Sequence, residues 1–336
     1  MLLSIDVGSV SLYAVQGSCS AGAVSIDRAG EIALPEVTIE DGMIKNHASF
    51  IMTVNKLLTL CRFTARNTVF TITSSSVLSR RLELPASTPR ELNMMVNNEM
   101  IQVVNDSSDF VYEYSIIGPE HASKQKTIPV WAYALPRDCV DQYYSVFNGI
   151  RLKPKALDIH PNSAEKLFVN SSVNGNEIGQ KSILFADIRQ NDVEIHLISD
   201  GQRAFSRTSP VSSSTFEAIL NNSGLVPENV SMFDSLDITS DKFRGNSILN
   251  DAAHQYINQI CEELQKMVQF QLRRNSTNPV AGVYIYGNMS GIRGLTEGMS
   301  SLLGIHVEKV EAVSKVKAGN LEIAKYINAI GALIRL

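Results

Sequence analysis

Four residues near the start of the chain have side chains suited to binding a phosphate group and its metal ion: Asp6, Gly8, Ser9 and Ser11. Asp6 ends an apolar run, Gly8 lets the backbone turn, and the serines follow before a second apolar run begins. In such a turn the backbone N–H groups can face an anion, and the aspartate can hold a hydrated Mg²⁺ ion. A plain β-hairpin uses the same residue types for conformational reasons alone. Both interpretations therefore stand at this point.

The same arrangement recurs in the second half of the chain. An apolar run over 183–186 ends at Asp187, and a polar turn separates it from the apolar run 193–198. Asp6 and Asp187 hold equivalent places in these two strand-turn-strand units. The repetition indicates a duplicated fold with a ligand site between its halves.

A third turn of this kind follows the apolar run 281–286. There Gly287 and Asn288 precede a helix that we expect to begin at Gly294. Free N–H groups and the dipole of a helix N-terminus can bind an anion. A tight strand-to-helix turn explains the same residues equally well.

Composition limits the classes of function. The chain has 336 residues, of which 44% are hydrophobic, enough to form the cores of two domains. A formal net charge of -4 gives no basic surface for nucleic acid or for a membrane. No apolar run is long enough to span a bilayer, and Met1 leads straight into a strand, so we expect a cytoplasmic protein without direct membrane insertion.

The cysteines and histidines indicate no metal site. Cys19, Cys61, Cys139 and Cys261 lie far apart in the sequence, which predicts reduced thiols rather than disulfides or metal ligands. The six histidines show no ligand spacing, so we expect each at the surface or as a hydrogen-bonded core residue, His160 included. The serine-rich stretches lack the pattern of a nucleophile elbow, which gives hydrolase chemistry no support.

The elements that must position the three turns alternate between strands and helices. A capping box at Thr88 and Glu91, with Pro89 between them, marks the start of one helix. The polar stretch 171–176 is the expected hinge between the halves. Periodicity predicts helices over 48–63, 88–103, 138–147, 162–169, 247–274 and 321–334, and strands over 12–16, 23–27, 67–73, 110–117, 128–135, 155–159 and 203–207.

Several stretches, taken in order, resemble the PilM family of type IV pilus assembly proteins, within the actin, Hsp70 and FtsA superfamily. The opening of that family usually reads D-I-G-S-S-S-I-K-A-V, and residues 6–15 here read D-V-G-S-V-S-L-Y-A-V. The other similar stretches are L-E-L-P at 82–85, R-E-L at 90–92, V-W-A-Y-A-L-P at 130–136, L-K-P-K-A-L-D at 152–158 and A-I-G-A-L-I-R at 329–335.

The resemblance implies an α/β protein with the actin-like ATPase fold, built from two duplicated halves around a central cleft. It also implies a small subdomain inserted in the first half. The implied segments are 1–34 and 109–176 for the main part of the first half, 35–108 for the insertion, 177–320 for the second half, and 321–336 for a helix that returns to the first half.

The resemblance also implies ligands. ATP with Mg²⁺ would bind in the cleft, where Asp6 and Asp187 would hold the metal through water. Gly8, Ser9 and Ser11 would face the phosphates. The adenosine would lie near a loop formed by Gly287 and Asn288. A groove on the first half would bind the N-terminal peptide of a PilN-like bitopic membrane protein, which would hold the chain at the inner face of the membrane as part of the pilus assembly platform.

Four departures from the family pattern bear on the nucleotide site. Tyr13 replaces a lysine, Arg189 replaces the glycine of the second turn, Ser212-Ser213 replaces a double glycine, and Asn288 replaces the second glycine of the third turn. We therefore expect a scaffold with a degenerate nucleotide site, in a type IV pilus or a related type II secretion or competence system. The alternatives are an ATPase or phosphotransferase of the same fold, or an FtsA-like protein that forms filaments.

Overall fold

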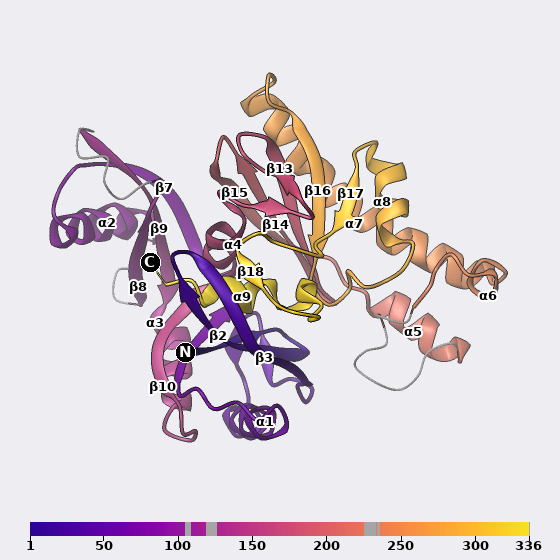
Figure 1. Cartoon of the computed structure of the whole chain (residues 1–336), viewed down its shortest axis with the longest axis horizontal. Helices are drawn as coiled ribbons and strands as arrows, with labels where there is room; N and C mark the ends of the chain where they lie inside the picture. Colours follow the sequence, from indigo (N-terminus) through magenta and orange to yellow (C-terminus); the bar gives the residue numbers. More distant parts are fainter. Residues whose placement is uncertain (105–108, 119–125, 225–232, 234–235, 336) are drawn as a thin grey trace.

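Two mixed β-sheets and one small sheet make up the molecule in the computed structural model, which describes residues 1–104, 109–118, 126–224, 233 and 236–335 (Figure 1). Within these ranges every helix is too short or too polar to cross a bilayer. The four cysteines are free thiols.

The first sheet holds the opening hairpin. Its six strands are, in spatial order, β10 (Lys153–Ile159), β6 (Asn67–Ile72), β1 (Leu2–Val7), β2 (Ser11–Ser20), β3 (Ala23–Ala33) and β18 (Val316–Lys317). β1 pairs antiparallel with β2 and parallel with β6, and β6 pairs parallel with β10. The carboxyl ends of β1, β6 and β10 therefore lie at one edge of the sheet, which is where ligands bind in open α/β sheets.

Two helices, α1 (His47–Leu60) and α3 (Arg137–Val146), cover one face of this sheet. Phe50, Phe70 and Tyr143 form the aromatic centre of their core. A two-stranded hairpin, β4 (Ile39–Glu40) with β5 (Met43–Ile44), packs beside them, and the Tyr143 hydroxyl donates to the Gly42 carbonyl at its turn over 2.9 Å.

The second sheet holds the repeat hairpin. Its strands are, in order, β15 (Gln202–Pro210), β14 (Asp192–Ser199), β13 (Ser182–Ile188), β16 (Val280–Tyr286) and β17 (Val307–Lys309). One face packs on the long helix α7 (Ser247–Arg274), whose buried residues recur at helical spacing. The helices α5 (Ser214–Ser223), α6 (Asp241–Arg244) and α8 (Leu295–Leu303) complete this core.

The small sheet consists of β7 (Leu78–Pro85), β9 (Thr127–Pro136) and β8 (Phe110–Ile116), with α2 (Pro89–Val104) on one face. The predicted capping box is confirmed at the start of α2, where the Thr88 N–H donates to the Glu91 carboxylate over 2.9 Å. The expectation that 35–108 is the insertion and that 109–176 rejoins the first sheet matches the strand pairing only at β10, which does lie in the first sheet. β6 belongs to the first sheet, and β8 and β9 belong to the small sheet, because strand alternation identifies a strand but not its partner.

One more helix, α4 (His160–Phe168), lies between the two main sheets with a 3₁₀ helix, η2 (Ile323–Tyr326), and with α9 (Ile327–Ala332). The prediction of one continuous helix over 321–334 is wrong, because this segment forms a 3₁₀ helix followed by a separate α-helix. The Ala324 carbonyl accepts the Gly287 N–H over 3.0 Å, and Tyr326 has φ -110° and ψ 7°, so the chain bends between η2 and α9. α9 then lies so close to α4 that a Cβ atom on Gly331 would lie 2.2 Å from the Ser163 carbonyl oxygen.

A buried arginine joins the small sheet to both halves. Arg203 of β15 is 1% exposed, and its Nε donates to the Glu165 carboxylate of α4 over 2.8 Å. Its Nη2 donates to the Tyr133 hydroxyl of β9, and its Cζ lies 4.4 Å from the centroid of the Trp131 ring. These contacts, which we call the Arg203 cluster, fix three parts of the fold against one another.

The chain crosses between the halves twice, and the two crossings are hydrogen-bonded to each other. The first includes the hairpin of β11 (Ser172–Val173) and β12 (Asn176–Glu177), and the second is 310–316. Asn174 Oδ1 accepts the N–H groups of Glu311 and Ala312 over 2.8 and 3.1 Å. The Ser172 N–H donates to Ser314 Oγ over 2.9 Å. The stretch predicted as a polar hinge is thus tied to the returning chain.

Candidate functional site

The first two predicted turns meet across the cleft between the halves. In the β1–β2 turn the Gly8 N–H donates to the Ser11 carbonyl over 3.0 Å, and a Cβ atom on Gly8 would lie 2.9 Å from that oxygen. Ser9 Oγ accepts a hydrogen bond from Asn191 Nδ2 of the β13–β14 turn over 3.1 Å. The Ser11 side chain is buried and contacts the Tyr13 hydroxyl.

The third turn lies against the second. Gly287 has φ +93°, and a Cβ atom there would lie 2.2 Å from Asp187 Oδ1, so only glycine fits. Asn288 Nδ2 donates to Gln190 Oε1 over 3.1 Å. The three turns are therefore neighbours, as a ligand site between the halves requires. The ligand roles of their residues stay predictions.

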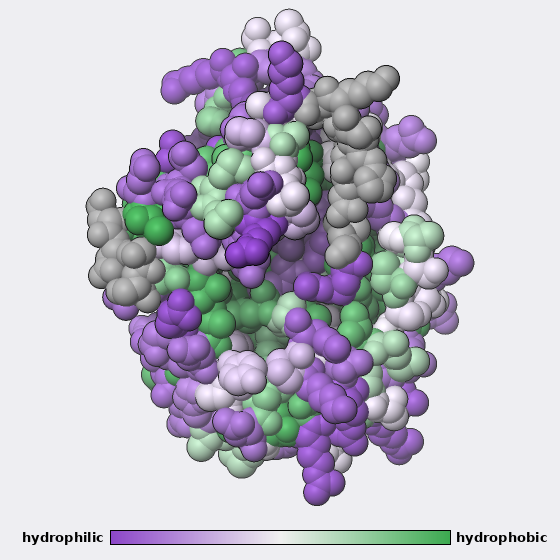
Figure 2. Space-filling model, turned by 90° about the vertical axis from the view of Figure 1, so that its left-hand side faces the viewer, coloured by the Kyte–Doolittle hydropathy of each residue, from purple (hydrophilic) through white to green (hydrophobic). Residues whose placement is uncertain are grey.

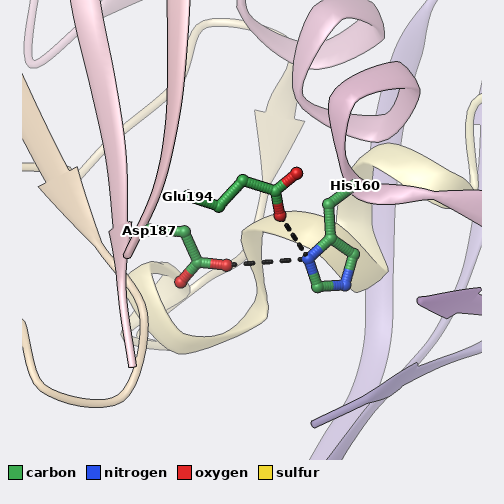
Figure 3. Close-up of side chains that lie close together, drawn as sticks. All are labelled: His160, Asp187 and Glu194. Carbon is green, nitrogen blue, oxygen red and sulfur yellow. Dashed lines mark hydrogen bonds and ion pairs between the residues drawn. The ribbon is translucent and has the colours of Figure 1, made fainter. Parts of the chain in front are cut away.

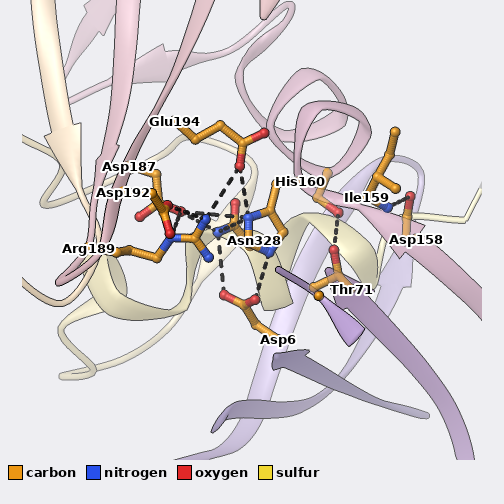
Figure 4. Close-up of polar contacts among 12 residues, drawn as sticks. Asp6, Thr71, Asp158, Ile159, His160, Asp187, Arg189, Asp192, Glu194 and Asn328 are labelled. Atoms are coloured by element: carbon orange, nitrogen blue, oxygen red, sulfur yellow. Dashed lines mark hydrogen bonds and ion pairs between the residues drawn. The ribbon is translucent and has the colours of Figure 1, made fainter. Parts of the chain in front are cut away.

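A histidine lies between the two repeated hairpins (Figure 4). His160 begins α4, is 0% exposed, and bonds through Nε2 to Asp6 Oδ1 over 2.7 Å and through Nδ1 to Glu194 Oε2 over 3.0 Å. Burial alone would lower the pKa of His160, but the Asp6 charge and the two hydrogen bonds raise it to about 10. In this arrangement the ring is an imidazolium that donates to a carboxylate from each half.

An asparagine of α9 joins the two equivalent aspartates. Asn328 Nδ2 lies 2.8 Å from Asp187 Oδ2 and 3.4 Å from Asp6 Oδ2. Burial raises the pKa of Asp187 to about 6, although the Arg189 and His160 charges lower it. The two carboxylates thus share protein donors.

Arg189 also turns into this network. Its Nη2 lies 2.8 Å from Asp192 Oδ1 and 3.8 Å from Glu194 Oε2, and its Nε lies 3.5 Å from Asp187 Oδ2. Burial raises the pKa of Glu194, but its hydrogen bond to His160 and the nearby cations outweigh burial and lower it to about 2. Every charged side chain of the network faces one of opposite sign.

These side chains take up the place where a hydrated Mg²⁺ ion would lie between Asp6 and Asp187. Mg²⁺ keeps several waters in its octahedral shell, whereas His160, Arg189 and Asn328 bond directly to the two aspartates or lie at ion-pair distance from them. The residues present therefore do not fit a hydrated Mg²⁺ ion bridging to phosphate.

The adjoining cavity does not favour a triphosphate either. It has a volume of about 480 Å³, and its lining includes Ser9, Glu40, Asp41 and Asp192. Arg189 is the one basic residue among the described residues that line it, and it already pairs with carboxylates. Phosphate oxygens there would meet more negative than positive charge.

Sequence reasoning missed three residues of the network: His160, Glu194 and Asn328. Signals for two of them exist. His160 follows β10, which runs parallel with β6 and through it with β1, so it lies at the same sheet edge as Asp6. Glu194 lies directly opposite Asp187 in the antiparallel hairpin. The signal for His160 requires the strand order, which periodicity does not supply, whereas the signal for Glu194 requires the register of the predicted hairpin.

Comparisons with known proteins agree over nearly the whole chain. A profile of the family described as "Type IV pilus assembly protein PilM" matches residues 4–331. A solved "PilM-PilN type IV pilus biogenesis complex" contains a similar chain with a TM-score of 0.77 and 18% identity, covering 99% of this chain and 97% of that one. The ethanolamine utilization protein EutJ from Carboxydothermus hydrogenoformans has a TM-score of 0.56 and 13% identity, covering 98% of this chain and 88% of that one. Comparison with curated protein sequences finds no significant match. The fold is the actin-like ATPase fold.

Proposed function

The chain belongs to the PilM family of type IV pilus assembly proteins, and from this premise we propose that it is a docking scaffold whose nucleotide site is degenerate. The observation that carries the proposal is the network of Asp6, His160, Asp187 and Glu194, in which protein cations replace the Mg²⁺ ion. In this proposal the chain binds the N-terminal peptide of a PilN-like bitopic membrane protein and is held at the inner face of the membrane by that partner. The system is a type IV pilus or a related type II secretion or competence pseudopilus.

A cavity of about 640 Å³ at the small sheet offers a docking groove. The end of β8 lines it through Ser115 and Ile116, α4 lines it through Glu165 and Lys166, and the start of β15 lines it through Gln202. β8 is an edge strand, and no described strand pairs with its outer side. Such an edge can pair with an extended peptide through backbone hydrogen bonds.

Figure 2 shows the side of the molecule that carries the small sheet. Hydrophilic side chains make up most of its rim, and hydrophobic surface gathers in a hollow in the middle of the view. The lining of the cavity is mainly polar, and Ile116, Val169 and Ile334 provide its apolar part. Such a lining suits a short peptide that carries a few apolar side chains.

A matched pair of tryptophan substitutions tests the groove. Gln202→Trp fills the cavity from its rim, whereas Gln255→Trp adds the same side chain to an exposed position on α7. Calorimetric titration with the N-terminal peptide of the PilN-like partner should show at least about tenfold weaker binding for Gln202→Trp, equivalent to about 1.4 kcal/mol. Unchanged affinity in both variants would count against this groove, and no binding by the unmodified chain would count against the docking function.

A second experiment tests the degenerate site against the enzyme alternatives. With ATP and Mg²⁺ we expect no rise in melting temperature and no phosphate release above the buffer blank. Phosphate release that depends on Mg²⁺ and disappears in Asp6→Ala would establish an ATPase or phosphotransferase instead. Sedimentation with and without ATP distinguishes the scaffold from a filament-forming protein.

A further inference from the structure

Four buried side chains from three parts of the fold converge on one small space at the centre of the cleft. Figure 3 shows His160, Asp187 and Glu194 pointing toward one another. One nitrogen or oxygen atom from each lies within 4.8 Å of those of the other two. Asn328 of α9 completes the group, with Nδ2 3.3 Å from His160 Nδ1. All four side chains belong to residues that are at most 3% exposed.

The separations between these atoms match a tetrahedral metal site. A Zn²⁺ ion with bonds of about 2.0–2.1 Å places its ligand atoms roughly 3.3–3.4 Å apart. His160 Nδ1 lies 3.0 Å from Glu194 Oε2 and 3.8 Å from Asp187 Oδ2. Asn328 Nδ2 lies 2.8 Å from Asp187 Oδ2. Shifts of a few tenths of an ångström would bring these atoms to equal distances from one ion.

Asn328 can offer its amide oxygen to the same ion. As placed, its Nδ2 faces the cluster and its Oδ1 is buried without a hydrogen-bond partner. The two ends of an amide are interchangeable by a half-turn of the side chain. After that half-turn, Oδ1 would take the place of Nδ2, which lies 2.8 Å from Asp187 Oδ2 and 3.3 Å from His160 Nδ1.

The charge balance of the network also favours a divalent ion. Asp6, Asp187 and Glu194 have side chains at most 6% exposed, and that of Asp192 is 22% exposed. Against these four carboxylates stands one permanent cation, the Arg189 guanidinium, at ion-pair distance from Asp187, Asp192 and Glu194. Buried charge without a partner is costly. A divalent ion among these carboxylates would offset part of their remaining negative charge.

Asp6 provides the outer support that metal-binding histidines use. A ligating histidine normally donates its other ring N–H to a carboxylate, which fixes the ring and its tautomer. His160 Nε2 donates to Asp6 Oδ1 over 2.7 Å, and this leaves Nδ1 for the metal. The set of one nitrogen and three oxygens in a buried space suits Zn²⁺ or Co²⁺ better than Mg²⁺, which demands octahedral oxygen ligands.

We propose that His160, Asp187, Glu194 and Asn328 bind a divalent transition-metal ion of the Zn²⁺ class directly, without nucleotide, and thereby join the two halves. On binding, the Nδ1 proton of His160 passes to solvent as the nitrogen–metal bond forms. The Nε2 proton stays in its hydrogen bond to Asp6. Arg189 remains at ion-pair distance from the ligand carboxylates and balances part of their remaining charge.

The test is a titration of the full chain with Co²⁺ after dialysis against a chelator. We expect one equivalent of Co²⁺ to give the intense visible absorption of a tetrahedral site, Zn²⁺ to displace it, and excess Mg²⁺ to leave it unchanged. Glu194→Gln should abolish the tetrahedral spectrum. Asp6→Asn should retain it with about 10–100-fold weaker affinity, the usual effect of losing such a carboxylate.

A surface pair provides the control. His306 and Glu308 lie 2.8 Å apart, with the His306 side chain 72% exposed, and could bind metal adventitiously. His306→Ala should leave the Co²⁺ spectrum intact. The proposal is overturned if the unmodified chain gives only the weak spectrum of octahedral Co²⁺, a result that requires no variant to fold. It is also overturned if His306→Ala loses the signal that Glu194→Gln retains.

Discussion

Replacing Arg203 by methionine should destabilise the fold more than any surface charge substitution. The Arg203→Met change keeps an unbranched side chain but removes the charge that faces Glu165, whose side chain is 17% exposed. Breaking a buried ion pair costs about 3–5 kcal/mol, because one charge stays buried without a partner. We expect the lower end of that range, since water reaches part of Glu165.

Urea unfolding followed by tryptophan fluorescence measures this effect directly. Trp131 is the single tryptophan of the chain, and it stacks on the Arg203 guanidinium. The variant should therefore unfold at lower urea concentration and show an altered emission in the native state. The control is Arg207→Met on the same strand. Its ion pair with Glu263 spans 3.7 Å and its side chain is 47% exposed, so a loss of at most about 1 kcal/mol is expected.

A double variant separates the charge effect from packing. Arg203→Met with Glu165→Gln removes both charges, and Tyr133 keeps Ser115 as a partner at 3.2 Å. Much of the lost free energy of unfolding should return, because no charge is then buried alone. The reasoning is refuted if the double variant loses the sum of the two single losses, or if Arg203→Met and Arg207→Met lose equal amounts.

Two further predictions concern close packing and thiol ionisation. Gly331→Ala should lower the free energy of unfolding by about 1–3 kcal/mol, measured by thermal unfolding, because its Cβ would press on a carbonyl oxygen of α4. In the control Gly298→Ala, the new Cβ meets only the end of a flexible side chain, so the free energy of unfolding should rise by up to about 1 kcal/mol. Equal effects of the two changes would contradict this reasoning. Burial raises the pKa of Cys139 to about 12 and of Cys261 to about 11, against about 8.5 in an unfolded chain. The contribution of these two thiols to the free energy of unfolding is therefore complete below about pH 8.5. It is lost as the pH rises above that value, because the thiols of the unfolded chain lose their protons first. Iodoacetamide at about pH 9 should label Cys19 before either of them, as mass spectrometry can show, and equal labelling of the native chain would argue against their burial.

The sequence predicted the fold well where the signal was local or repeated. The duplicated strand-turn-strand units placed Asp6 and Asp187 in equivalent positions, and the structure joins them through Asn328. The long helix over 247–274 is confirmed at both ends. The resemblance to the PilM family, and with it the actin-like fold, is also confirmed.

The predictions failed where the neighbour of a strand or of a side chain lies far away in the sequence. β8 and β9 have the alternation of strands, but only pairing assigns them to the small sheet. His160 and Glu194 carry no motif, because they meet through the order of strands in two different sheets. Arg189 was noted only as the replacement for a glycine in the second turn, and its contacts with Asp187 and Asp192 were not foreseen.

The two hydrogen-bonded crossings between the halves have a mechanical consequence. A single connection would act as a swivel, around which one half could turn in any direction. Two adjacent connections that are bonded to each other resist sliding and twisting of the halves, because such motion must first break the bonds between Asn174 and the returning chain. Rotation about the line through both crossings would open the cleft, but it must break the hydrogen bonds that His160 and Asn328 make to the second half. The crossings therefore set the direction of any opening, and the buried side chains of the cleft hold it closed.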